Sequence, residues 1–563
     1  MGTSAPILPR EWHERAIAAE RSGSPQEAER IITQALGAHP REHELHNSAG
    51  NIALRRGDHD LAARRFADAL ALAPSHLPYA INQAIAQTDA GHPREALATL
   101  EPHEAAGSRE ARYCSTRANA ARLTGDLAEA SRWYDQALAL KADHPRALAG
   151  RARVALERCE ADALARINFA LRHDAANAHL WLAKAQALDI TGDRTGALTV
   201  TRQIVDQAPA WQPGLDFLAQ LRRSEGDGDF TGHYAEAAAR VPQDPNIPAA
   251  HIAALAAAER FAEAAECAAR AQQRFANLER FVMLEATFAS AAGDDPRAQA
   301  AFARVQEDTV DRAIHEARHA LRTQQWPQAQ AALDRALGRA PFDIQAWALT
   351  GLLWRATQDD RARWLHEQEG LVRLMPLADA EEVLPPARSL LRKVHKTSAF
   401  PYDQSLRGGT QTRGILFHRT EPELAALHDA LLATLETYRA GLPAPDLAHP
   451  LLRAAGQDWA LAGSWSVRLN GGGDHHAAHI HPQGVLSSAL YLVLPAPDAS
   501  QGALEIGRPP PDLRLDLPPL EVIAPREGHL ALFPSTLYHG TTGFAEGERM
   551  TVAFDVVAGE APA

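Results

Sequence analysis

The sequence predicts an α-helical solenoid of helix–turn–helix repeats followed by a mainly β domain. Three observations support this prediction: glycines recur every 34 residues, the hydrophobic period changes near residue 375, and short apolar segments follow residue 460. A period of about 34 residues is typical of repeats built from two helices. We therefore expect the solenoid at residues 10–375, a linker and domain entry at 376–412, and the β domain at 413–558.

Each predicted repeat carries a glycine and, five residues later, an alanine. The glycines are Gly23, Gly57, Gly91, Gly125 and Gly192, and the alanines are Ala28, Ala62, Ala96, Ala130 and Ala197. One position of the series is skipped, at Cys159. Glycine permits the positive φ that a tight turn between two helices needs, and a small alanine lets the second helix pack against the first. Prolines such as Pro40 and Pro74 end the second helix of a unit.

This order of glycine, alanine and proline within a 34-residue period resembles the tetratricopeptide repeat. The resemblance is strong over residues 10–210. It continues to residue 375, where the segments FAEAAECAARAQQRF and WPQAQAALDRALGRAP keep the pattern of a second helix. The resemblance implies a solenoid whose groove binds a protein or peptide partner. A passive scaffold or oligomerisation surface is the alternative.

Composition narrows the class of protein. The chain has 563 residues, of which 46% are hydrophobic and 23% charged, as is typical of folded proteins. Its net charge of −13 disfavours nucleic acid and anionic membranes as partners. The three scattered cysteines argue against a disulfide framework and a Cys-based zinc site. No apolar run is long enough to span a membrane and the first residues lack the apolar core of a signal peptide, so we expect a cytoplasmic protein.

The C-terminal third changes from a helical to a β pattern. A single helix is predicted at 421–443. Short alternating or fully apolar runs follow, separated by Gly, Pro, Asp and Asn, at 464–469, 485–494, 503–507, 528–534 and 549–557. Several short strands within about 100 residues predict a sandwich or jelly roll.

Histidines in the predicted β domain form a pattern that suits a metal. His479 and His481 are two residues apart just before a predicted strand, so both imidazoles point to the same side of an extended segment. His539 follows 60 residues after His479, and Arg549 comes ten residues after His539. Two imidazoles on one side can hold one divalent ion, with a third ligand from a facing strand.

The segments around these residues resemble the 2-oxoglutarate/Fe(II)-dependent oxygenase family that is often fused to tetratricopeptide repeats. The matching segments are His479-Ile-His481-Pro482, then Ser487-Ser488-Ala489-Leu490-Tyr491, and the stretches WSVRLNGGGDHH, GHLALFPSTLYHGT and RMTVAFDVV. The resemblance implies a double-stranded β-helix, or jelly roll, that uses Fe(II), 2-oxoglutarate and O₂ to hydroxylate a substrate. In that picture His479, His481 and His539 ligate the iron, and Arg549 binds the distal carboxylate of 2-oxoglutarate.

The resemblance implies two further site residues, and the chain differs from the common family pattern at one position. Thr551 shares a strand face with Arg549, and both Thr551 and Tyr491 would add hydroxyl hydrogen bonds to 2-oxoglutarate. The common triad of the family has a carboxylate where this chain has His481. Three neutral ligands would then hold the iron.

Other interpretations fit parts of the pattern. A cupin-like metal-binding jelly roll can use three histidines but does not explain Arg549, and a catalytically inactive oxygenase fold could serve as a binding module on a protein-interaction scaffold. The sequence leaves open whether the substrate is a protein or a small molecule, and what the oligomeric state is. His475 and His476 are interpreted as solvated loop residues. The segment RGGTQT at 407–412 is a candidate for the mouth of the substrate site.

Overall fold

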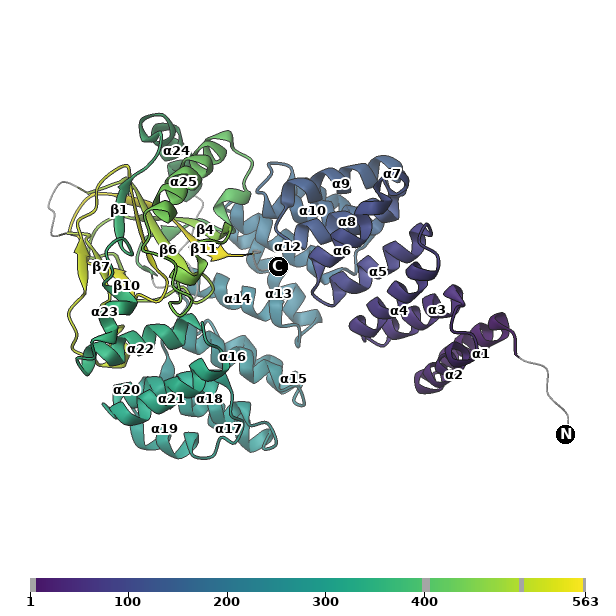
Figure 1. The fold of residues 1–563 in the computed structure, drawn as a ribbon, viewed down its shortest axis with the longest axis horizontal. Coiled ribbons are helices and arrows are strands. Elements are labelled where there is room, and N and C mark those ends of the chain that lie inside the picture. The colour runs from purple at the N-terminus through teal and green to yellow at the C-terminus, as the bar shows by residue number, and fades with distance from the viewer. Residues whose placement is uncertain (1–6, 397–405, 496–500, 560–563) are drawn as a thin grey trace. The chain divides into compact units, whose positions relative to one another are not determined.

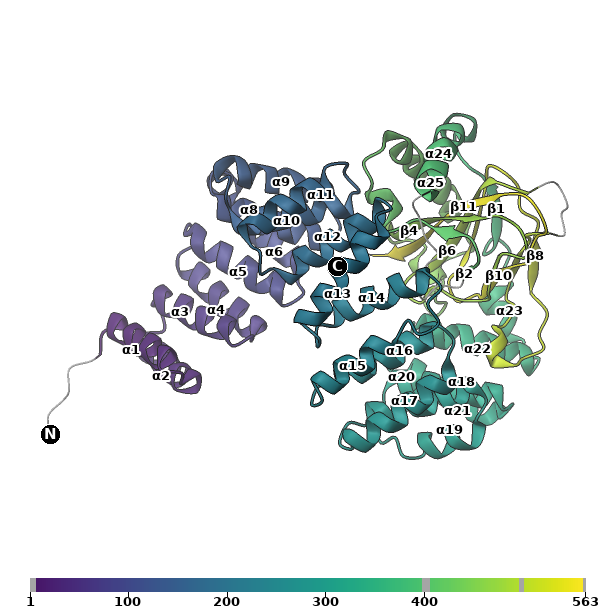
Figure 2. The same cartoon turned by 180° about the vertical axis from the view of Figure 1, so that it is seen from behind.

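The computed structural model describes residues 7–396, 406–495 and 501–559. The chain divides into two compact units, the first ending at Ala183 and the second beginning at Lys184. Figures 1 and 2 show the elements of both units from opposite sides. In its described part, the first unit contains helices alone, whereas the second contains further helices and all the strands.

The first unit is a series of antiparallel helix pairs, drawn in purple and blue in Figure 1. The pairs are α1 (Pro9–Arg21) with α2 (Pro25–Ala38), α3 (His43–Arg55) with α4 (His59–Leu72), α5 (Leu77–Asp89) with α6 (Pro93–Leu100), α8 (Ala111–Leu123) with α9 (Leu127–Leu140), and α10 (Pro145–Glu157) with α11 (Ala163–His173). A short insertion, η1 (Glu101–His103) and α7 (Glu104–Gly107), precedes α8. The predicted helical solenoid is confirmed.

The turn within each of these pairs has one residue in the left-handed region. The glycines of the predicted series have positive φ, at Gly23 (79°), Gly57 (77°), Gly91 (87°) and Gly125 (85°). Cys159 takes the same conformation, with φ of 52°, at the position where the glycine series is interrupted. The predicted small residues behind the turns are fully buried: Ala28, Ala62, Ala96 and Ala130. Glycine and alanine therefore have the structural roles that the sequence pattern predicted.

The second unit continues the helix pairs. They are α12 (Ala178–Ile190), which crosses the boundary between the units, α13 (Arg194–Gln207), α14 (Gln212–Ser224), α15 (Gly232–Arg240), α16 (Asn246–Ala257), α17 (Phe261–Arg274), α18 (Arg280–Ala292), α19 (Asp295–Phe302), α20 (Val310–Arg322), α21 (Trp326–Arg339), α22 (Ile344–Ala356) and α23 (Arg361–His366). Three of their turns place a residue other than glycine in the left-handed region: Glu259 (58°), Gln324 (56°) and Gln358 (60°). The repeat geometry therefore persists at turns that lack a glycine, as well as at those that keep one, such as Gly192, Gly226 and Gly293.

The large sheet of the β domain begins within the region expected to be solenoid. Strand β1 (Arg373–Pro376) pairs with β9 (His529–Pro534) at one edge of this sheet. The segment 376–412, expected to be a linker and domain entry, contains α24 (Ala380–His395), β2 (Leu406–Arg407) and β3 (Thr410–Gln411). Part of that segment, 397–405, lies outside the described residues. The helix expected at 421–443 is α25 (Pro422–Ala440).

The β domain contains two antiparallel sheets that share an inner core. The larger sheet has the strand order β1-β9-β6-β11-β4-β3, and the smaller one has the order β10-β7-β8. Side chains of β6 and β9 pack with those of β7 and β8 between the sheets. The remaining strands are β4 (Trp459–Leu469), β5 (His475–His476), which pairs with β2, β6 (Leu486–Val493), β7 (Leu504–Ile506), β8 (Glu521–Ile523), β10 (His539–Thr541) and β11 (Arg549–Ala558). The predicted double-stranded β-helix after an α solenoid is confirmed.

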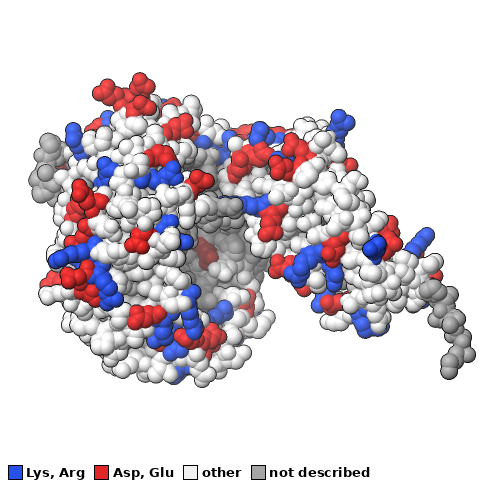
Figure 3. Space-filling model, viewed as in Figure 1, with Lys and Arg blue, Asp and Glu red and all other residues white. Residues whose placement is uncertain are grey.

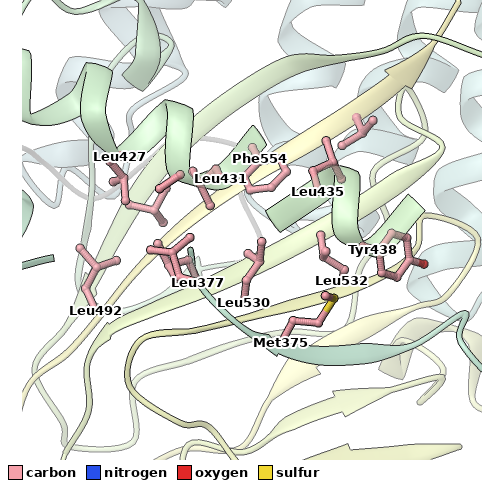
Figure 4. Packing of buried hydrophobic residues seen from close by; sticks show 14 of the residues in the cluster. Met375, Leu377, Leu427, Leu431, Leu435, Tyr438, Leu492, Leu530, Leu532 and Phe554 are labelled. Atoms are coloured by element: carbon pink, nitrogen blue, oxygen red, sulfur yellow. The ribbon is translucent and has the colours of Figure 1, made fainter. Parts of the chain in front are cut away.

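The outer face of the large sheet is covered by α24 and α25. Figure 4 shows Leu427, Leu431 and Leu435, at four-residue spacing along α25, packed against the sheet beside residues such as Leu532 and Phe554. All five are at most 1% exposed. Burying a side chain of this size stabilises the fold by about 1.5–3 kcal/mol. This packing leaves the inner face of the sheet for the candidate site.

Within the second unit, a cluster of charged side chains joins the repeats to the β domain. Arg318 and Arg322 of α20 both bind the carboxylate of Asp512 in η4 (Pro511–Leu513), Arg318 at 2.7 Å. Arg318 also donates to the hydroxyl of Tyr538 at 3.2 Å, next to His539 in the chain. Burial alone would raise the pKa of Asp512, but the two guanidinium groups outweigh burial and lower it. Asp512 is therefore an anion held between two cations.

On the face shown in Figure 3, acidic and basic side chains are interspersed. Among the residues that the structure describes, no helix is both long and apolar enough to cross a membrane.

We predict that Asp512→Asn lowers the free energy of unfolding of the second unit by about 2–4 kcal/mol, because two partly buried guanidinium groups lose their anion. The pKa of Asp512 is lower in the folded than in the unfolded protein. The contribution of Asp512 to stability is therefore present above its unfolded-state pKa and is lost as the pH falls through its folded-state pKa. Urea denaturation at pH 7 and at acidic pH measures both effects.

Asp360→Asn is the matched control. Its carboxylate is 91% exposed and pairs with Arg363, which is 76% exposed, so the change should stay within about 0.5 kcal/mol. Equal destabilisation by the two substitutions would show that the Asp512 cluster does not anchor the repeats.

Candidate active site

Three histidines of the β domain lie close together. His479 and His481 lie between β5 and β6, and His539 begins β10. His479 and His539 exchange backbone hydrogen bonds of 3.0 and 2.9 Å as an isolated antiparallel bridge. One potential ligand atom from each histidine lies within 4.8 Å of the other two. The structure thus brings together the three histidines that the sequence spacing singled out.

The three imidazoles have a common hydrogen-bonding pattern. Nδ1 of His479 lies 2.8 Å from the carbonyl oxygen of Ala477, and Nδ1 of His539 lies 3.2 Å from that of Leu537. Nδ1 of His481 contacts the carboxylate of Asp555. A carbonyl or carboxylate oxygen accepts a hydrogen bond, so we assign the proton of each ring to Nδ1 and the lone pair to Nε2. This orientation is typical of metal-binding histidines.

Burial keeps His539 in the form that a metal requires. The pKa of His539 lies well below its usual range, chiefly because desolvation disfavours the imidazolium and also because His479 and His481 are close. Neutral imidazole is the metal-binding form of histidine.

Asp555 is a member of the site that the sequence analysis did not identify. It lies on β11, where Arg549, Thr551 and Asp555 follow one another at even spacing and therefore share a face. That even spacing from Arg549 was the available signal. The carboxylate of Asp555 contacts Nδ1 of His481 and so lies behind this histidine.

His476 is part of the structured site. It lies in β5, half-buried, with its ring centroid 6.0 Å from that of His479 and 25° between the ring planes. Its pKa lies well below the usual range because of desolvation first, and then because of His479 and Arg549. The interpretation of His476 as a solvated loop residue is therefore wrong. His475, also in β5, directs Nδ1 to the carbonyl oxygen of Gly473 at 2.9 Å.

Arg549 is a buried cation at the start of β11. Its side chain donates to the carbonyl oxygen of Gly502 at 2.7 Å, and its guanidinium carbon lies 5.4 Å from the ring centroid of Tyr491. Within the described ranges, no carboxylate forms an ion pair with it. Burial lowers the pKa of Arg549, although Tyr491 opposes this effect. Because a buried charge is stable only when it is paired, this position suits an anionic ligand.

Two hydroxyl groups lie on the same inner face as Arg549. Tyr491 of β6 is fully buried, and its hydroxyl has no hydrogen-bond partner among the described residues. Burial raises its pKa, so the phenol keeps its proton and can donate it in a hydrogen bond. Thr551 is directly opposite Tyr491 in the pairing of β11 with β6. The structure therefore places Arg549, Thr551 and Tyr491 together.

A cavity of about 1180 Å³ borders His479 and His481. The β domain lines it with residues that include Trp465, Ile480 and Gln411. Gln411 belongs to the segment RGGTQT, which was a candidate for the substrate mouth. Helices α16, α17, α18, α20 and α22 of the same unit also line the cavity. The sequence analysis missed this contribution, because the repeat helices lie far from the histidines along the chain.

Two family models match the chain. The model described as "Putative 2OG-Fe(II) oxygenase" matches residues 463–555, and the model described as "Tetratricopeptide repeat" matches residues 13–76 and 315–362. The first match contains the three histidines, Arg549 and Asp555. A search of curated proteins finds no match.

Similar solved structures include tetratricopeptide repeat proteins. One from Parabacteroides merdae is 15% identical, with a TM-score of 0.37, and the match covers 43% of this chain and 97% of that one. A thermophilic one from Thermus thermophilus is 22% identical, with a TM-score of 0.27 and coverages of 32% and 99%. Yeast Tom70 is 13% identical, with a TM-score of 0.29 and coverages of 63% and 96%. The chain therefore carries tetratricopeptide repeats in its N-terminal part and, at residues 463–555, a domain that matches the 2OG-Fe(II) oxygenase family.

Proposed function

We propose that the β domain is a 2-oxoglutarate/Fe(II)-dependent dioxygenase that hydroxylates its substrate. The observation that carries the proposal is a cluster of three oriented histidines beside a buried arginine that has no carboxylate partner within the described ranges. A metal ion and a dicarboxylate together satisfy both features. The metal binds unprotonated imidazole nitrogens, and the carboxylate pairs with the guanidinium group.

In this proposal His479, His481 and His539 hold the iron. Bound there with 2-oxoglutarate and O₂, Fe(II) supplies the oxidation of 2-oxoglutarate to succinate and CO₂ and the transfer of one oxygen atom into a C–H bond. Three protein ligands leave coordination positions for the cosubstrate and O₂. Asp555 accepts the Nδ1 proton of His481 and places a negative charge behind the ligand that replaces the usual carboxylate.

Arg549 would bind the distal carboxylate of 2-oxoglutarate, because a guanidinium group forms two parallel hydrogen bonds with a carboxylate. Tyr491 and Thr551 would donate hydroxyl hydrogen bonds to the same ligand. All three side chains are buried, which excludes water and strengthens these interactions. A cupin-like metal site would use the histidines but would not need Arg549, so the arginine favours the oxygenase over that alternative.

We also propose that the repeats bind a protein or peptide partner. In the first unit, a cavity of about 400 Å³ is lined mainly by the first helices of successive pairs. Equivalent positions meet there, since Ile85, Asn119 and Arg153 follow one another at the repeat spacing. Amide and guanidinium groups can hydrogen-bond the carbonyl and carboxylate groups of a peptide.

We predict that His479→Ala and His539→Ala each abolish retention of Fe(II), because only two imidazoles then remain to hold the ion. Anaerobic titration with Fe(II) and 2-oxoglutarate should give the weak visible charge-transfer band of the chelate in the wild type but not in either variant. Helical circular dichroism should stay unchanged, because the solenoid lies outside the cluster.

His529→Ala provides the matched control. His529 lies on β9 with Nδ1 facing the carbonyl oxygen of Glu527, outside the histidine cluster, and its loss should leave the band intact. A metal-loaded wild type without the band would contradict the dioxygenase assignment. Variants that keep stoichiometric iron would contradict the ligand set.

Asp555→Ala should weaken metal binding by about 10- to 100-fold, because His481 loses the acceptor that orients its ring. Asp555→Asn should weaken it less, since an amide oxygen still accepts the Nδ1 proton. Anaerobic Co(II) titration, followed by the visible absorption of the bound ion, gives the affinities. Asp458→Ala removes an exposed carboxylate and is expected to match the wild type. Unchanged affinity in Asp555→Ala would remove the aspartate from the site.

Arg549→Ala should weaken 2-oxoglutarate binding while barely changing metal affinity. Loss of a charge-assisted bidentate pair costs about 2–4 kcal/mol, which corresponds to roughly 30- to 1000-fold in the dissociation constant. Arg549→Lys should recover part of the loss, because an ammonium group cannot form the two parallel bonds. Calorimetric titration of 2-oxoglutarate into the anaerobic Mn(II) protein measures both variants. Affinity equal to that of the wild type would refute the cosubstrate role and favour a cupin-like site.

A further inference from the structure

The cavity beside the histidines is partly built by the repeats of the second unit. Helices α16, α17, α18, α20 and α22 contribute Ala257, Phe261, Ala291, Arg318 and Gln345, respectively. These side chains border the same space as His479 and His481. The repeats therefore supply a wall of the candidate active site.

This wall is fixed to the β domain. Arg318 contacts both Asp512 and the hydroxyl of Tyr538, which precedes His539. Leu513 and Tyr538 share a hydrophobic cluster with residues of α20, α21 and α22. A ligand that touches these helices is thus held at a fixed position relative to the histidines.

The charged groups around the cavity are largely paired with one another. The pairs are Arg318 and Arg322 with Asp512, Arg514 with Asp295 at 3.4 Å, His315 with Asp311 at 3.5 Å, and His481 with Asp555. Glu259 is exposed to solvent. A charged ligand would have to compete with these internal pairs, whereas an uncharged ligand leaves all of them intact.

Apart from Thr287 and the histidines of the β domain, the other lining groups are apolar or carry amides. Phe261 and Phe288 stack with their centroids 6.3 Å apart, and Trp465 lines the β side. Gln345, Gln411 and Gln483 offer primary amides, which both donate and accept hydrogen bonds as a peptide backbone does. The volume of about 1180 Å³ exceeds the roughly 300–1,000 Å³ of small-molecule pockets.

We propose that this cavity binds an uncharged stretch of polypeptide, recognised by helices α16, α17, α18, α20 and α22 and presented to the histidine cluster. The inference rests on the proposed function for the chemistry that follows binding, but binding itself needs only the cavity. It selects a protein over a small molecule, the choice that the sequence left open.

Two neighbouring alanines provide the test. Ala291 is half-buried and lines the cavity, whereas Ala292, the last residue of α18, is exposed and lies outside the lining.

The full-length protein is incubated with a pool of acetylated, amidated nonapeptides made of uncharged residues, and with a pool enriched in Asp and Lys. Peptides that co-elute with the protein are identified by mass spectrometry.

We expect the wild type and Ala292→Trp to retain uncharged peptides, and Ala291→Trp to lose about tenfold or more of that affinity, because the indole fills the cavity. Ala257→Trp, on α16, fills it from another helix and gives the same test if Ala291→Trp lowers thermal stability. Retained peptides should raise succinate formation in the presence of Fe(II), 2-oxoglutarate and O₂, and should gain one oxygen atom.

Three results would each overturn the inference. The first is equal retention of peptides by the wild type and both cavity-filling variants, and the second is preferential retention of the charged pool. The third is succinate formation that is stimulated by small amino acids and organic acids but by no peptide. Peptide retention that is lost in Ala291→Trp, in a protein that shows no iron–2-oxoglutarate band, would support this inference and refute the proposed oxygenase.

Discussion

The pairing of β11 on both sides, in the interior of the large sheet, fixes the candidate site. Thr551 is opposite Val467 of β4 and opposite Tyr491 of β6. Alternate residues of β11, such as Val552 and Phe554, belong to the hydrophobic core beneath α25. The residues that alternate with them along β11, including Arg549 and Asp555, therefore face the interior between the two sheets. A slip of one residue would exchange the two sets, so the core that α25 covers also enforces the positions of the arginine and the aspartate.

The repeat array could be predicted from sequence as long as glycine marked each turn. The signal weakened after about residue 210, yet the turn conformation did not change, because Glu259, Gln324 and Gln358 adopt the left-handed region without being glycine. Such a residue costs about 1–2 kcal/mol at the turn, which the packing of the helix pair offsets. Glycine spacing marks the turns that reach the left-handed conformation at the lowest energetic cost, whereas tertiary packing determines where the repeat array ends. Strand β1 escaped prediction for a related reason, since four residues carry too little periodicity to identify a strand.

The candidate site could be predicted to the extent that it follows local spacing. His479 and His481 share a segment, and Arg549 and Thr551 share a strand, so two short patterns and one distal histidine described most of it. Asp555 belongs to the second pattern, but its contact with His481 joins segments 74 residues apart. The repeat wall is more remote still, because the arginines of α20 meet Asp512 and Tyr538 only after the second unit has folded. Contacts of this kind depend on topology, which spacing along the chain does not encode.

The distribution of charge makes the two ends of the candidate site suited to different ligands. A divalent metal held by three neutral imidazoles keeps its full charge, and Asp555 offsets part of it from behind His481. Arg549 adds a further buried cation without a carboxylate in the described ranges, so this end is electrically incomplete until an anion binds. Toward the repeats, Arg318 and Arg322 already share Asp512, and a charged ligand there would have to compete with this pairing. In the function proposed above, the same electrostatics would direct a dicarboxylate to the interior of the β domain and a neutral chain to the repeat wall, so that the two ligands would not compete for one place.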